Sequence, residues 1–159
     1  MSESRVLGHD LKGGLSLVFM SLLSISMACA KEHPCTDAEA QRAETETDTL
    51  RSWDSLHSWY KRYKQCDDGG IAEGYSEAVA RTLVDHWTAL PRLSKLAKSD
   101  AGFRRFVLGH VDATLNNDDL KKIRANANTQ CPSGLDAPCA DLAKEADDAL
   151  KDLDSLGIK

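Results

Sequence analysis

The chain has 159 residues, a length that suits one domain rather than two. Hydrophobic residues make up 42% of it and charged residues 28%, a composition that excludes disorder along the whole chain. The 20 basic residues are outnumbered by 25 acidic ones, and the formal net charge is −5. Nucleic-acid binders gain most of their affinity from basic residues that neutralise phosphates, so we expect no nucleic-acid partner.

Residues 1–30 have the pattern of a signal peptide. Basic residues precede an uncharged run, and the apolar core of that run, residues 15–27, is short for a membrane span of about 20 residues. Small residues at 28–30 suit the recognition site of a signal peptidase, so we predict cleavage after Ala30. An uncleaved membrane anchor is the competing interpretation of the same run.

A lipoprotein leader is a further alternative. The sequence Ser26-Met27-Ala28-Cys29 resembles the lipobox of bacterial lipoproteins, in which the cysteine receives the lipid. Ser26 departs from that motif, which usually has an aliphatic residue three positions before the cysteine. Lipidation at Cys29 would anchor the protein to a membrane without changing its fold, and without it we expect no membrane contact.

The remaining cysteines predict two disulfide bonds. Four of them follow the leader, and an exported chain of this size commonly pairs such cysteines. They are Cys35, Cys66, Cys131 and Cys139. A zinc site would need a Cys-x2-Cys spacing, which is missing, and we expect no cofactor. Three pairings can form, and we favour Cys66 with Cys131 or Cys139, because these cysteines lie at predicted helix ends.

After the leader we expect an acidic lead-in over residues 31–49 and a helical domain over residues 50–159. Thr36 or Asp37 can cap a helix, and residues 44–48 either begin a long solvated helix or fray, since threonine lowers helix propensity. From residue 50 onward, apolar residues recur at intervals of three and four, which predicts a helix with one buried face. Its residues are Leu50, Trp53, Leu56, Tyr60 and Tyr63.

Turn residues divide the rest of the chain into further amphipathic helices. Gly69-Gly70 breaks the first, and Asp67 or Asp68 can cap the second. Helical spacing of apolar residues predicts helices over 71–90, 101–115, 118–128 and 139–156. No useful stretch alternates apolar and polar residues, so we predict an all-α fold. The expected architecture is a single domain of five or six helices in a compact bundle, stabilised by two disulfides.

Three residues are candidates for contact with a partner. Trp59 points away from the apolar stripe of its helix, so we expect an exposed aromatic side chain that can anchor a partner. Asp67 and Asp68 lie in the turn that follows and add negative charge there. The rest of a calcium-binding loop is absent around them, and helix capping is their simpler role.

Histidines offer the other candidate chemistry. His57, His86 and His110 could supply a metal site or a proton switch. On packed helices, however, His86 and His110 would lie about 9 Å apart along the axis, which makes shared ligation awkward. Gly74 precedes Ser76, but the second glycine of a nucleophile elbow is missing, so no serine hydrolase is indicated.

These features together predict a small exported binding protein of the cell envelope, periplasmic or secreted, with no enzymatic activity and another protein as its partner. In length, predicted export, helicity and disulfides the chain looks like periplasmic inhibitors and immunity-type proteins. This resemblance concerns these general features and includes no family motif. One alternative is a lipidated structural protein of the inner or outer membrane. The other is a metal-dependent enzyme that uses His86 and His110.

Overall fold

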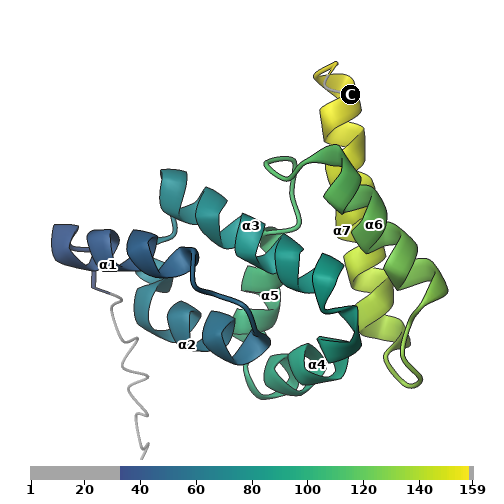
Figure 1. The fold of residues 1–159 in the computed structure, drawn as a ribbon, viewed down its shortest axis with the longest axis horizontal. Coiled ribbons are helices and arrows are strands. Elements are labelled where there is room, and N and C mark those ends of the chain that lie inside the picture. Colours follow the sequence, from purple (N-terminus) through teal and green to yellow (C-terminus); the bar gives the residue numbers. More distant parts are fainter. Residues whose placement is uncertain (1–32, 158–159) are drawn as a thin grey trace, which may run out of the picture. The chain divides into compact units, whose positions relative to one another are not determined.

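The computed structural model describes residues 33–157, and this part of the chain is all-α, with seven α-helices, two short 3-10 helices and no strand (Figure 1). The predicted signal peptide and the predicted lipidation site at Cys29 lie outside the described residues. None of the described helices is both long and apolar enough to cross a membrane. The α-helices are α1 Asp37–Thr47, α2 Trp53–Tyr63, α3 Gly69–Asp85, α4 Leu90–Ser99, α5 Ala101–Gly109, α6 Asn117–Thr129 and α7 Asp136–Ser155. The all-α class is confirmed.

The helix count exceeds the predicted five or six because α1 and α4 were not predicted as separate helices. The predicted helix over 71–90 ends at Asp85 as α3; a 3-10 helix, Trp87–Ala89, then turns the chain into α4. Pro91 lies in the first turn of α4, where a missing N–H costs no helical hydrogen bond. The acidic stretch before Leu50 forms the separate helix α1, which is neither frayed nor joined to α2.

The described helices share one buried core whose centre is aromatic. Rings from α2, α3 and α5 meet there at centroid distances of 4.5–6.4 Å, a range in which tilted and edge-to-face pairs add stability. The cluster includes Trp59, Tyr60, Tyr63, Tyr75, Phe103 and Phe106. The Tyr75 hydroxyl donates to the Leu56 carbonyl oxygen at 2.9 Å, and burial raises the pKa of this phenol strongly.

Helices α6 and α7 form a hairpin and lie side by side (Figure 1). The disulfide Cys131–Cys139 closes the turn between them, and Arg124 donates to Asp147 across the pair at 2.9 Å. Both helices bury apolar residues at helical spacing, among them Leu120, Ile123, Leu142, Ala146, Leu150 and Leu153.

The second disulfide joins Cys35 to Cys66, so two disulfides are confirmed but the favoured pairing is wrong. Cys66 lies in the 3-10 helix Lys64–Cys66 at the end of α2, next to the start of α1. Cys131 and Cys139 are only eight residues apart and flank one helix–helix turn, so they meet each other rather than Cys66.

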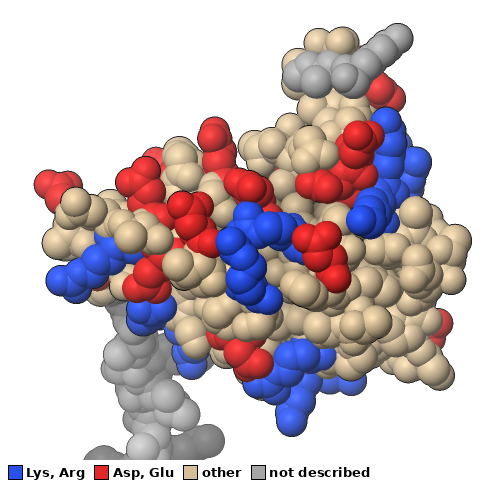
Figure 2. Space-filling model, viewed as in Figure 1, with Lys and Arg blue, Asp and Glu red and all other residues tan. Residues whose placement is uncertain are grey.

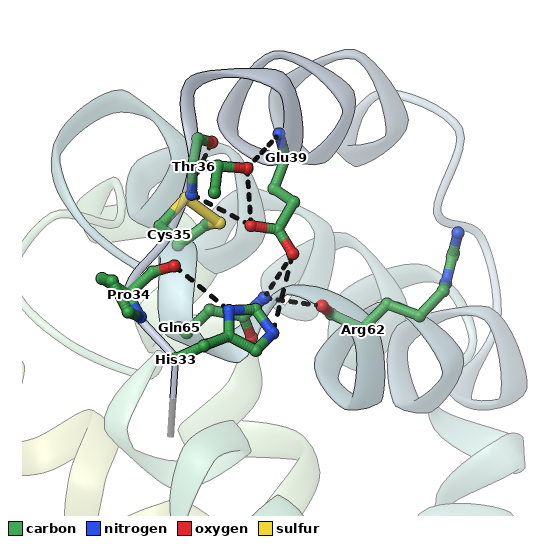
Figure 3. Close-up of polar contacts among 8 residues, drawn as sticks. His33, Pro34, Cys35, Thr36, Glu39, Arg62 and Gln65 are labelled. Atoms are coloured by element: carbon green, nitrogen blue, oxygen red, sulfur yellow. Dashed lines mark hydrogen bonds and ion pairs between the residues drawn. A yellow bond between two sulfur atoms is a disulfide. The ribbon is translucent and has the colours of Figure 1, made fainter. Parts of the chain in front are cut away.

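The start of α1 is fixed by a capping box (Figure 3). The Thr36 backbone N–H donates to the Glu39 carboxylate at 2.9 Å, and the Glu39 backbone N–H donates to the Thr36 hydroxyl at 3.3 Å. Hydrogen bonds from Thr36 lower the pKa of Glu39. The side chain of Gln65 donates to the same carboxylate at 3.4 Å, beside the Cys35–Cys66 bridge. These contacts hold α1 against the end of α2.

Close packing of α1 on α3 depends on Gly74. A Cβ atom at this position would lie 2.9 Å from the Thr47 hydroxyl oxygen, closer than a real contact allows. Thr47 and Ala43 of α1 are buried as a result, and the Arg62 guanidinium on α2 pairs with Glu46 of α1 at 2.5 Å. Helix α1 is therefore an integral part of the folded domain.

Candidate functional site

Trp59, one of the three predicted contact residues, was expected to be exposed, and this prediction is wrong. Its side chain is fully buried, and its indole N–H donates to the Ala43 carbonyl oxygen in α1 at 3.0 Å. The sequence pattern shows a single apolar stripe on α2, but α1 covers a second face of that helix. A separate α1 was not anticipated, and for that reason Trp59 was expected to face solvent.

The two aspartates of the turn have different surroundings. Asp68 is exposed and is the N-cap of α3, where its carboxylate accepts a hydrogen bond from the Gly69 backbone N–H at 2.8 Å. Asp67 turns inward, and its Oδ2 lies 3.3 Å from Nε2 of His110. Neither residue lines the apolar pocket described below.

Asp67 belongs to a polar cluster that joins three elements: the turn before α3, α3 itself and the residue after α5. His110 is buried, and its Nδ1 lies 2.8 Å from the Ser76 hydroxyl while its Nε2 faces Asp67. We call Asp67, Ser76 and His110 the His110 cluster. Sequence reasoning missed it, because 34 residues separate Ser76 from His110 and only the packing of α3 against the end of α5 brings them together.

The His110 cluster has the connectivity of an Asp–His–Ser triad, but its geometry favours a structural role. In serine hydrolases the serine bonds to Nε2 and the aspartate to Nδ1, whereas here the two ring nitrogens are exchanged. Ser76 is only 2% exposed and lies within α3, where backbone N–H groups are used in helical hydrogen bonds and cannot stabilise an oxyanion. The cluster therefore acts as a hydrogen-bonded joint between helices.

The other two histidines are apart from this cluster. His57 pairs through Nε2 with Asp100 at 3.1 Å, and Asp100 also caps α5 by accepting from the Phe103 backbone N–H. The hydrogen bond from the Phe103 N–H lowers the pKa of Asp100, and the hydrogen bond with His57 lowers it further by a smaller amount. His86 is exposed and follows the last residue of α3.

No metal centre is formed by the described residues. His86 lines a small depression beside Arg51 and Asp85, while His110 lines a different one, so the structure does not bring them together. Within residues 33–157, no three His, Cys, Asp or Glu side chains are close enough to hold a metal ion. The described residues therefore do not bring together the two histidines named in the metal-dependent alternative.

A concave apolar pocket lies where α4, α5 and the first turns of α7 meet. It has a volume of about 210 Å³, and each helix contributes residues spaced by about four, which places them on one face. We call it the α4–α5–α7 pocket. Its apolar lining comprises Leu93, Ala97, Val107, Leu108, Ala137, Pro138 and Leu142. Small side chains at 97 and 137 leave the space open.

Three charged residues, Lys98, Arg104 and Asp141, also line this pocket. Arg104 forms an ion pair with Asp141. Lys98, one residue after Ala97, is exposed and has no hydrogen-bond or ion-pair partner among the described residues. Since the charges of Arg104 and Asp141 cancel, the pocket carries one uncompensated positive charge.

The surrounding surface is polar and mixed in charge. Acidic and basic side chains are interspersed over the face seen in Figure 2. Among residues 33–157, Leu156 is the one large hydrophobic side chain that is exposed, with 68% of its surface accessible. A concave apolar pocket is therefore a distinctive feature of this surface.

Comparison with known proteins adds no relative: no protein-family model, curated protein or solved structure matches the chain. The class of protein follows from the fold and the pocket alone. The described residues form a disulfide-bonded, all-α domain with a concave apolar pocket between α4, α5 and α7.

Proposed function

We propose that the protein is an exported binding protein of the cell envelope that acts without catalysis, by contact with another protein, as inhibitors and immunity-type proteins do. The observation that carries this proposal is the α4–α5–α7 pocket. Engineered apolar cavities of about 150 Å³ bind benzene. A pocket of about 210 Å³ therefore suits one aromatic or branched side chain of a partner. Such buried anchors dominate the affinity of protein interfaces.

Two further features support the proposal. Disulfides persist in oxidising compartments, so the bonds Cys35–Cys66 and Cys131–Cys139 suit an exported protein. They fix the start of α1 against the end of α2 and close the α6–α7 turn. A preformed surface loses little conformational entropy when it binds. Around the pocket, the uncompensated Lys98 favours a partner with an acidic residue next to its anchor.

The test compares a pocket-filling variant with a matched control. Ala97→Trp fills the pocket, whereas Ala38→Trp places the same side chain at an exposed position on α1. Each purified protein is used to capture partners from an envelope extract of the native cells, after circular dichroism and thermal melting show that it is folded. We expect a partner that the wild type and Ala38→Trp retain and Ala97→Trp loses.

A protein retained equally by Ala97→Trp would bind elsewhere and would contradict the role of the pocket. The lipobox-like sequence ending at Cys29 supports a membrane-anchored form of the same proposal. Intact mass spectrometry of the native protein distinguishes the two forms. A soluble protein begins at Lys31 with four hydrogens missing, and an anchored one begins at lipidated Cys29.

A further inference from the structure

We infer that the α4–α5–α7 pocket binds a free aliphatic monocarboxylate of about six to eight carbons, with the tail inside and the carboxylate at Lys98. This goes beyond the proposed function, because it assigns a small-molecule ligand to the chain. It holds whether or not a protein partner exists. If both exist, they compete for the same pocket.

The tail is indicated by the apolar lining and the size of the pocket. Leu93, Val107 and Leu142 are buried core residues, at 6%, 1% and 1% exposure, and they line the pocket on α4, α5 and α7. A cavity with such a lining favours an apolar occupant over water. Because six carbons of benzene suit about 150 Å³, a pocket of 210 Å³ suits about eight.

The head group is indicated by the charges. Lys98 lines the pocket without a partner among the described residues, whereas Arg104 is already paired with Asp141. One free ammonium group suits one carboxylate. An alkylammonium ion would meet Lys98 with like charge, and a neutral alcohol would form no ion pair with it. The pocket should therefore distinguish ligands with the same tail by their charge.

The experiment titrates the purified, oxidised protein with octanoate, octan-1-ol and octylammonium, each below its micelle concentration. Binding is followed by calorimetry and by the NMR shifts of the Ala97 and Ala137 methyl groups. We expect octanoate to bind one to one, to shift both methyl groups and to bind more tightly than the other two compounds. Ala97→Trp should abolish the heat and the shift of the Ala137 methyl group, while Ala38→Trp should leave binding unchanged.

A pair of lysines on one helix provides the matched control for the charge. Lys98 lines the pocket and Lys95 does not, although both are exposed residues of α4. We expect Lys98→Ala to weaken octanoate binding about fivefold, as the loss of one partly exposed ion pair would, and Lys95→Ala to have no effect. Binding of octan-1-ol should be the same in both variants.

Three results would overturn the inference: octanoate fails to bind, octylammonium binds as tightly as octanoate, or Lys95→Ala weakens binding as much as Lys98→Ala. Its failure is distinguishable from that of the proposed function. A protein partner lost only by Ala97→Trp, without octanoate binding, rejects the carboxylate site alone. Octanoate binding without any such partner rejects the protein–protein proposal alone.

Discussion

The two disulfides should contribute unequally to stability, because they close loops of different length. Cys35–Cys66 spans 31 residues and Cys131–Cys139 spans eight. The loss of chain entropy in the unfolded state predicts about 3.7 kcal/mol for the longer loop and about 2.5 kcal/mol for the shorter one. Replacing both cysteines of the longer loop by alanine should therefore cost about 1.2 kcal/mol more than the same change in the shorter loop.

This comparison is well controlled by the structure. Each pair contains one buried cysteine, Cys66 or Cys139, and both are 3% exposed. Each pair also contains one partly exposed member. The packing lost with the sulfur atoms is thus similar in the two double variants, and the difference between them reports mainly loop closure.

The assay is equilibrium unfolding in urea of the oxidised wild type and of the double variants Cys35→Ala/Cys66→Ala and Cys131→Ala/Cys139→Ala. The free energy of unfolding in water is compared by linear extrapolation. We expect both variants to be less stable than the wild type, with Cys35→Ala/Cys66→Ala the less stable of the two. Equal losses, or the reverse order, would refute the chain-entropy argument. No loss at Cys35 and Cys66 would mean that this bond does not stabilise the fold.

Three further predictions test individual contacts. Trp59→Phe should lower the free energy of unfolding by about 2 kcal/mol, because indole packing and one hydrogen bond are lost. If the midpoint of urea unfolding were the same in this variant as in the wild type, the Trp59 indole would be exposed. His110→Phe should lower the free energy of unfolding by about 1–3 kcal/mol, because it leaves Asp67 without its buried partner. Unchanged stability would show that the His110 cluster does not hold the helices together. The hydrogen bond from Arg62 lowers the pKa of Glu46 in the folded protein. The Glu46 carboxylate therefore stabilises the fold fully above its ordinary pKa of 4.5. This contribution is lost as the pH falls through the lowered pKa of the folded state. Glu46→Gln should therefore cost up to about 1 kcal/mol at neutral pH and nothing at low pH, in urea unfolding at both; a loss that persists in acid would contradict this pairing.

Local signals in the sequence predicted the helices and their caps well. Thr36 and Asp68 were each expected at helix starts, and each accepts a hydrogen bond from a backbone N–H there. Capping depends on residues within three or four positions, so one sequence contains the information. The ends of helices were predicted less well; for example, the helix expected to extend to Leu115 ends at Gly109.

Contacts between distant segments could not be predicted in the same way. The apolar stripe of α2 identifies one buried face, but it does not reveal that α1 covers Trp59. Likewise, the four cysteines imply two bonds, while the pairing depends on which helix ends meet. The His110 cluster joins Ser76 to His110 across 34 positions, and no local pattern in the sequence pairs these two residues.

The pocket is the clearest example of this limit. Ala97 and Ala137 look like ordinary helix residues in the sequence, and their small size matters only because α4 and α7 approach the same side of α5. Lys98 is also unremarkable until its place beside that space is known. A binding site of this kind becomes visible only once the helices have been placed in three dimensions.

The most direct test of binding through the α4–α5–α7 pocket is photo-crosslinking in the native cells. A photoreactive lysine analogue replaces Lys98 beside the pocket or, as the control, Lys95 on the same helix outside it. We predict a discrete crosslinked protein in the envelope fraction from position 98 and none from position 95. Crosslinking at position 95 alone, or at neither position, would contradict the account.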